Sequence, residues 1–161
     1  MSKSLSIGDV IVATAKQKRD AAKARLSSAV AEKPKDVILR ACETMADQLK
    51  DDGFSFIKSG PKLKRVHGDH VFSVMFQSDR NNIAGTRAAV WIHGGVQNSG
   101  RAEFIDGGQI GSLLPQKTWM EWDFADETTR ESEINDAVAA IRRIILPFFA
   151  QFENRTVEPL G

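Results

Sequence analysis

Cysteine, net charge and long apolar runs are nearly absent from this sequence of 161 residues, and each absence excludes a class of protein. The single cysteine, Cys42, excludes a disulfide framework and favours a reducing compartment. No segment approaches the roughly 20 apolar residues of a membrane span, and residues 1–5 lack the apolar run of a secretory signal. We therefore expect a cytoplasmic protein that does not associate with membranes.

Known catalytic and cofactor-binding motifs are missing as well. The glycines between residues 98 and 115 do not precede the Gly-Lys-Ser/Thr of a P-loop, and no Gly-x-Ser-x-Gly accompanies His93-Gly94-Gly95. His67 and His70 flank a turn, but neither a carboxylate pair nor a cysteine completes a metal-ligand spacing. We expect no cofactor and no metal site, and we interpret Cys42 as a buried apolar side chain.

What the chain does contain is alternation of apolar and other residues, which is typical of strands. In residues 71–77, Phe72, Val74 and Phe76 point to one side, whereas the opposite side is mixed. Such patterns, with glycine-containing turns at 59–61 and 67–70, predict strands at residues 54–58, 62–67, 70–78, 86–93 and 117–124. Gly94-Gly95 is expected to bulge or end the fourth strand, and residues 98–115 are expected to form a long loop.

Helices are predicted on both sides of these strands. The Ala- and Lys-rich residues 7–32 form a predicted helix with few apolar anchors. Pro34 opens a second helix, which Gly53 ends in a left-handed conformation. Thr128 and Glu131 resemble a capping box at the start of the last helix, which Pro147 should kink or end near residue 146. The apolar stripe of that last helix consists of Ile134, Val138, Ile141, Ile145, Phe148 and Phe152.

These elements predict an α+β fold with an antiparallel sheet of about five strands. The sheet is expected to be packed by an N-terminal helix pair and by a long C-terminal amphipathic helix. We expect residues 1–33 to form a basic helical arm and residues 34–161 to form a single α+β domain. A hydrophobic content of 42% is sufficient for such a core without disulfides or metal.

The mixed side of the sheet is the candidate binding surface. If the strands are antiparallel neighbours, one surface gathers aromatic, cationic and imidazole groups, and Trp, Arg and Met are enriched in protein interfaces. The alternative is that a helix, such as the N-terminal one, covers this surface as ordinary core. The candidate partner-binding residues are Gln77, Arg87, Trp91, His93, Trp119 and Glu121, with Met75 beside them.

Several short motifs resemble a bacterial family of domains of unknown function. They are Gly53-Phe54, the Gly68-Asp69 turn, Phe76-Gln77-Ser78, Asn82 and the strand Val90-Trp91-Ile92-His93, and the resemblance covers about residues 37 to 153. It implies an α+β fold without established catalytic residues. Some members of that family occur beside toxin genes, which implies immunity or another partner-binding role. The basic N-terminal extension departs from the family pattern.

The sequence therefore predicts a non-catalytic protein-binding module, which would act as an immunity or inhibitor protein that neutralises a partner. A second hypothesis is a small-molecule-binding protein or enzyme, with His93 as general base and Arg87 as anion holder. A third is nucleic-acid binding through the basic helical arm, although the whole chain is nearly neutral. Its cations are Lys16, Lys18, Arg19, Lys23 and Arg25. Formation of a homo-oligomer is compatible with all three hypotheses.

Overall fold

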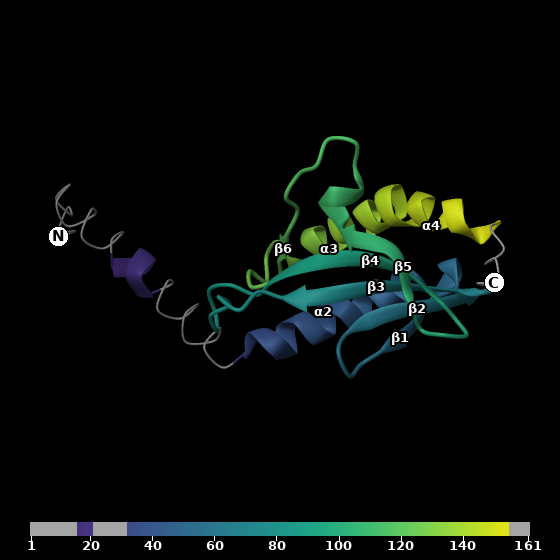
Figure 1. The fold of residues 1–161 in the computed structure, drawn as a ribbon. Helices are drawn as coiled ribbons and strands as arrows, with labels where there is room; N and C mark the ends of the chain where they lie inside the picture. The colour runs from purple at the N-terminus through teal and green to yellow at the C-terminus, as the bar shows by residue number, and fades with distance from the viewer. Residues whose placement is uncertain (1–15, 21–31, 155–161) are drawn as a thin grey trace, which may run out of the picture.

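The computed structural model describes residues 16–20 and 32–154, and residues 32–154 form one antiparallel sheet and the helices packed on it (Figure 1). Residues 16–20 are helical and exposed. The other elements are, in order, α2 (Pro34–Gln48), the 3-10 turn η1 (Lys50–Asp52), β1 (Ser55–Ile57), β2 (Lys62–His67), β3 (His70–Ser78), β4 (Ala89–Asn98), β5 (Phe104–Gln109), the 3-10 turn η2 (Ile110–Leu113), β6 (Trp122–Asp123), α3 (Arg130–Ala140), the π-helical turn η3 (Ile141–Ile145) and α4 (Leu146–Glu153).

The sheet has the strand order β1-β2-β3-β4-β5, and every neighbouring pair is antiparallel. The short β6 pairs with β4 beyond the end of β5. The predicted α+β class and antiparallel sheet are thus confirmed. The described sheet has six strands, however, rather than about five.

The additional strand is β5, which lies inside the segment that the sequence assigned to a loop. Its Gly107 and Gly108 pair with Gly95 and Gly94 of β4. A Cβ atom on Gly107 would lie 2.3 Å from the Gly94 carbonyl oxygen, so glycine is required where the two backbones approach. The loop prediction was wrong because these glycines permit strand contact instead of marking a turn.

The ends of two other predicted strands also differ from the structure. β4 does not stop at Gly94-Gly95 but continues to Asn98, with a register shift between Val96 and Gln97. A Cβ on Gly94 would lie 3.3 Å from Ile145 Cγ2, so the missing side chain lets η3 approach the sheet. The predicted strand 117–124 shrinks to β6, since Thr118 N–H donates to the Gly111 carbonyl rather than to a neighbouring strand.

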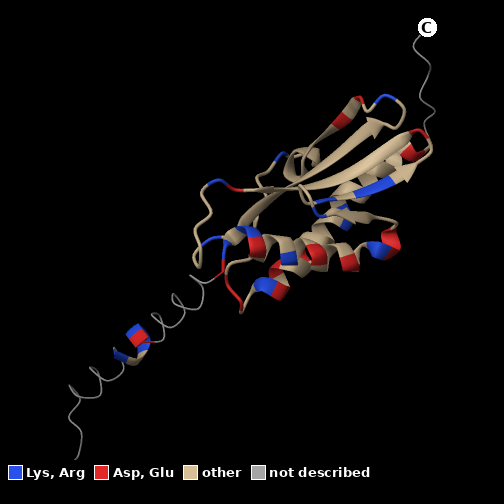
Figure 2. Ribbon diagram, turned by 90° about the horizontal axis from the view of Figure 1, so that it is seen from below, with Lys and Arg blue, Asp and Glu red and all other residues tan. Residues whose placement is uncertain are grey.

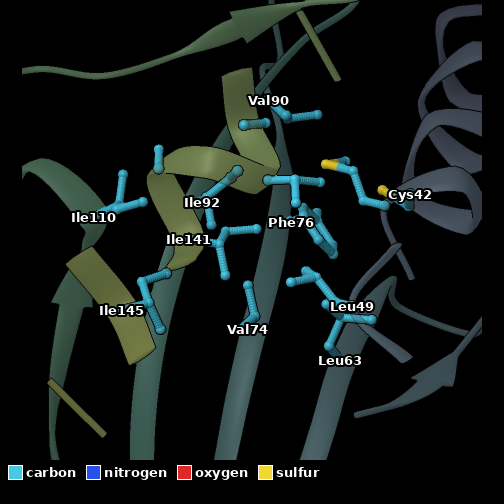
Figure 3. Packing of buried hydrophobic residues seen from close by; sticks show 14 of the residues in the cluster. Cys42, Leu49, Leu63, Val74, Phe76, Val90, Ile92, Ile110, Ile141 and Ile145 are labelled. Atoms are coloured by element: carbon cyan, nitrogen blue, oxygen red, sulfur yellow. The ribbon is translucent and has the colours of Figure 1, made fainter. Parts of the chain in front are cut away.

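The hydrophobic core lies between one face of the sheet and the helices (Figure 3). α2 and the C-terminal helical segment lie side by side there, since Gln48 of α2 hydrogen-bonds Asn135 at 3.2 Å and its carbonyl accepts from Arg142 at 2.7 Å. The fully buried core side chains include Leu63, Phe72, Val74 and Ile92 from the strands, Cys42 and Leu49 from the α2 region, and Ile141, Ile145 and Phe149 from the C-terminal segment.

The C-terminal helix is long and passes through Pro147 without ending. α3, η3 and α4 follow one another in right-handed helical conformation from Arg130 to Glu153. In the π-helical turn the Leu146 N–H donates to the Ile141 carbonyl, and Pro147 then occupies a first-turn position of α4, where its missing N–H is tolerated. The predicted early end was wrong because the chain stays helical to Glu153, whereas the helix type does change from π to α at residue 146. The kink stays a prediction.

The predicted helix and turn signals were confirmed in most places. Pro34 begins α2, and Gly68 at φ 57° forms the turn between β2 and β3. Gly53 adopts the predicted left-handed conformation at φ 88°, but it ends η1, since α2 itself ends at Gln48. The capping box was misplaced, because the residue before α3 is Thr129 and it makes no side-chain cap bond. Thr128 donates instead to Asp126 at 2.7 Å.

The predicted N-terminal helix is described only at residues 16–20. These residues include the exposed Lys16, Lys18 and Arg19. Lys23 and Arg25, and the question of how this helix packs, lie outside the described residues. Packing of the N-terminal helix beside α2, the predicted helix pair, therefore stays a prediction.

Candidate functional site

The sheet has two chemically different faces, which the strand register defines. The strand residues of β1 to β4 that join the hydrophobic core, such as Leu63, Phe72 and Ile92, share one face, and the helices bury their apolar residues there. We call the opposite side the outer face. From β1 to β4 it consists of Ser55, Ile57, Lys62, Lys64, Val66, Val71, Ser73, Met75, Gln77, Ala89, Trp91, His93, Gly95 and Gln97.

The outer face keeps large apolar side chains in contact with solvent. Val66 is 61% exposed and Met75 is 39% exposed, although both lie within strands. Trp119, from the loop that precedes β6, is 61% exposed and packs on Trp91 of β4. Figure 2 shows that Lys, Arg, Asp and Glu concentrate on the helices and loops, while the strands carry few charges apart from the Lys and Arg residues of β2.

Glu121 is the centre of a hydrogen-bonded cluster at one end of this face. Its two carboxylate oxygens each accept from Arg87 Nη2 at 3.1 Å, and Oε2 also accepts from the indole N–H groups of Trp91 and Trp119, both at 3.4 Å. The two indole rings meet edge to face, with centroids 4.9 Å apart and planes at 74°. One carboxylate thus fixes the orientation of both tryptophans and of one arginine.

Asp79 is the second carboxylate that contacts Arg87. Its Oδ2 accepts from Arg87 Nη2 at 2.8 Å, and its Oδ1 accepts from the Asn81 backbone N–H at 2.9 Å. The Asn81 N–H and then Arg87 lower the pKa of Asp79, and the bonds to Asp79 and Glu121 raise the pKa of Arg87. Asp79 is therefore ionised at neutral pH, and Arg87 makes its contacts with both carboxylates through Nη2.

The loop between β3 and β4 is fixed by a side chain that imitates a strand. Asn82 donates through Nδ2 to the Ala89 carbonyl at 2.9 Å and accepts from the Ala89 N–H at 2.8 Å. This pair of bonds closes the loop in the way that a neighbouring strand would. It positions Arg87, which lies two residues before β4, over the outer face.

His93 and Gln77 complete the site through the strand register. Gln77 is opposite Trp91, and His93 lies between Met75 of β3 and Gln109 of β5. His93 Nε2 is buried and has no hydrogen-bond partner among the described residues. Burial lowers the pKa of His93, so the imidazole is neutral at neutral pH.

All six residues proposed from the sequence therefore lie around one surface. Arg87, Trp91, Trp119 and Glu121 contact one another directly, whereas Gln77 and His93 adjoin Trp91 along the strands. Sequence reasoning missed Asp79, whose signal was its place at the end of a strand two residues before an asparagine. It also placed Trp119 and Glu121 on a strand, whereas both precede β6.

The remaining histidines and the cysteine have structural surroundings. His70 is buried, stacks on Phe72 at 6.1 Å and meets Phe152 edge to face, while His67 is exposed. Cys42 is buried in the core, and burial raises the pKa of its thiol to about 12. Within residues 16–20 and 32–154, no group of three His, Cys, Asp or Glu side chains could hold a metal ion.

The chain was compared with protein-family models, with curated proteins and with solved structures, and no match was found. Among the described residues, no helix has the length and apolar content that crossing a membrane requires.

Proposed function

We propose that this protein is a non-catalytic binding module that holds a protein partner on the outer face of its sheet. The observation that carries the proposal is the tryptophan pair, in which Trp119 remains 61% exposed although its indole N–H is bonded to Glu121. Large aromatic side chains that are fixed before binding lose little conformational entropy in a complex. They are the residues that most often dominate the energy of protein interfaces.

The surroundings of the tryptophan pair support the same function. Met75 and Val66 extend the exposed apolar surface along β3 and β2. Arg87 forms a polar border whose charge is balanced by Asp79 and Glu121. An aromatic centre with a satisfied polar rim is the usual composition of a protein interface.

A catalytic function of the same face has weaker support. A general base must accept a proton from a substrate, but His93 Nε2 is buried. An anion holder must offer uncompensated positive charge, but the charge of Arg87 is already balanced by the carboxylates of Asp79 and Glu121. The described geometry therefore favours binding over the enzyme hypothesis.

The more specific proposal is an immunity or inhibitor role. It rests on the resemblance in residues 37 to 153 to a bacterial family in which some members occur beside toxin genes. An inhibitor of this kind needs a rigid, preformed surface, and the bonds of Glu121 and Asn82 provide one. Nucleic-acid binding through the basic helical arm stays a prediction.

The proposal can be tested by placing a photo-crosslinking amino acid at Gln77 of the full chain in its native cells. A second chain carries the same group at Ala139, which is exposed on α3. A protein partner should be captured from position 77 and not from position 139. Trp119→Ala should then weaken binding of the purified partner by about 30-fold or more, which corresponds to the hot-spot threshold of about 2 kcal/mol.

The matched control is Arg143→Ala, which removes an exposed side chain from η3. Its affinity for the partner should equal that of the unmodified chain. Equal affinities of all three proteins, or capture from position 139 alone, would show that the outer face is not the binding surface.

A further inference from the structure

The outer face carries two lysines that lack a compensating charge. Lys62 and Lys64 lie two residues apart on β2 and are partly buried. On the outer face their strand neighbours are Ile57 and Met75 for Lys62, and Ser55 and Ser73 for Lys64. None of these neighbours is acidic.

Six of the other cations in the described chain are paired, and the ten without an ion pair are all exposed, whereas Lys62 and Lys64 are partly buried. Arg40, Arg65, Arg87, Arg130 and Arg142 each contact a carboxylate within 4 Å, and even the exposed Lys58 lies 3.9 Å from Glu43. Within residues 16–20 and 32–154, neither Lys62 nor Lys64 makes such a pair. The outward residues of β1 to β4 include these two lysines and no carboxylate.

We infer that the partner presents an acidic extended segment whose carboxylates, two residues apart, bind Lys62 and Lys64. This inference rests on the proposed function. Alternate residues of one strand are separated by about 6.7 Å, so the side chains of a Glu-x-Glu segment that runs along β2 match the spacing of the two lysines. Met75, which pairs with Lys62, and the tryptophan pair beyond it then receive apolar side chains of the same partner.

The charge distribution favours an acidic protein over a single-stranded nucleic acid. Nucleic acids bind where cations flank the aromatic residues on which the bases stack. Here the tryptophan pair lies beside two carboxylates, Asp79 and Glu121, and one guanidinium. The uncompensated positive charge lies instead on β2, which the tryptophan strand β4 does not adjoin.

The test uses defined probes with the full-length protein. The probes are an alternating Glu-Leu octapeptide, its Gln-Leu and Lys-Leu counterparts, and a thymidine oligonucleotide. Binding is followed by amide chemical shifts and by the tryptophan fluorescence of the chain. The Glu-Leu peptide should bind at least tenfold more tightly than the other probes, should shift the amides of β2, and should weaken with added salt.

The decisive variants are Lys62→Glu with Lys64→Glu, repeated as Lys62→Gln with Lys64→Gln. Each should lower the affinity for the Glu-Leu peptide by tenfold or more. The matched control, Lys35→Glu with Lys50→Glu, changes exposed lysines of the helical side and should leave it unchanged. Thermal melts establish that every variant is folded.

Several results would overturn the inference. They are equal binding of the Gln-Leu peptide, tighter binding of the oligonucleotide, no saturable binding of the Glu-Leu peptide at millimolar concentration, or insensitivity to both lysine variants. If Trp119→Ala abolishes partner binding while the lysine variants do not, the inference of an acidic segment is wrong, but the outer face remains the binding surface. If neither change affects the captured partner, the proposed function fails as well.

Discussion

Ile141→Ala tests whether the C-terminal helix anchors the sheet in the way described. Ile141 is fully buried in the π turn η3 and points toward Val74 and Ile92 (Figure 3). The substitution removes three carbon atoms, which at about 0.8 kcal/mol each amounts to about 2.4 kcal/mol of lost transfer free energy. A residual cavity adds to this loss, so we expect a total of about 3 to 4 kcal/mol.

The assay is equilibrium unfolding in urea, followed by far-UV circular dichroism. The transition midpoint should fall while the slope stays constant, because a cavity changes stability and not the surface exposed on unfolding. Arg143→Ala, two residues away and exposed, should stay within about 0.5 kcal/mol of the unmodified chain. A loss below about 0.5 kcal/mol for Ile141→Ala would refute the helix orientation.

Three further predictions concern other parts of the structure. Pro147→Ala should destabilise the chain by about 0.4 to 1 kcal/mol, because the folded helix accommodates the proline and alanine raises the conformational entropy of the unfolded chain. A stabilised variant in the same urea assay would show that the proline is strained. Burial lowers the pKa of His93 below its unfolded value of about 6.5, so the unfolded chain binds more protons than the folded chain between the two pKa values. The free energy of unfolding should therefore be highest above about pH 6.5 and should decline as the pH falls toward the folded pKa. His93→Gln should flatten that decline in melts at a series of pH values, and an unchanged slope would contradict the assignment. Glu121→Ala should cost about 1 kcal/mol and lower the tryptophan fluorescence anisotropy, because it frees Trp91 and Trp119. The exposed Glu127→Ala should leave both quantities unchanged, and equal anisotropy in the two variants would rule out the role of Glu121.

The periodic parts of the fold were accessible from the sequence because burial imposes a period on each element. Phe72, Val74 and Phe76 alternate, so they revealed the buried face of β3, and Ile134, Val138, Ile141 and Ile145 were recognised as the buried side of the last helix. The glycine signals at Gly53 and Gly68 were equally informative, since both adopt positive φ. Local chemistry decides these features.

The remaining errors have a tertiary cause. Gly107 and Gly108 belong to a strand only because Gly94 and Gly95 lie opposite them, and no local pattern shows this pairing. Pro147 is tolerated because the preceding turn is π-helical, which depends on how Ile141 and Ile145 pack.

The composition of the candidate site was predictable, but its bonding was not. Strand alternation was sufficient to place Trp91 and His93 on one face with Gln77. The shared acceptor Glu121 could not be foreseen, since it bonds Arg87 from 34 positions away and approaches from a loop. The partnership of Arg87 with Asp79 likewise depends on the shape of the loop that Asn82 closes.

The central claim is that the tryptophan pair of the outer face contacts a protein partner, and the three tryptophans of the chain provide its most direct test. Trp91 and Trp119 lie on the outer face, whereas Trp122 is buried and donates its indole N–H to Asp136 at 2.8 Å. In a chain labelled with 5-fluorotryptophan, saturation with the captured partner should shift the fluorine resonances of Trp91 and Trp119 and leave that of Trp122 in place. Unchanged resonances of Trp91 and Trp119 at saturation would contradict the claim.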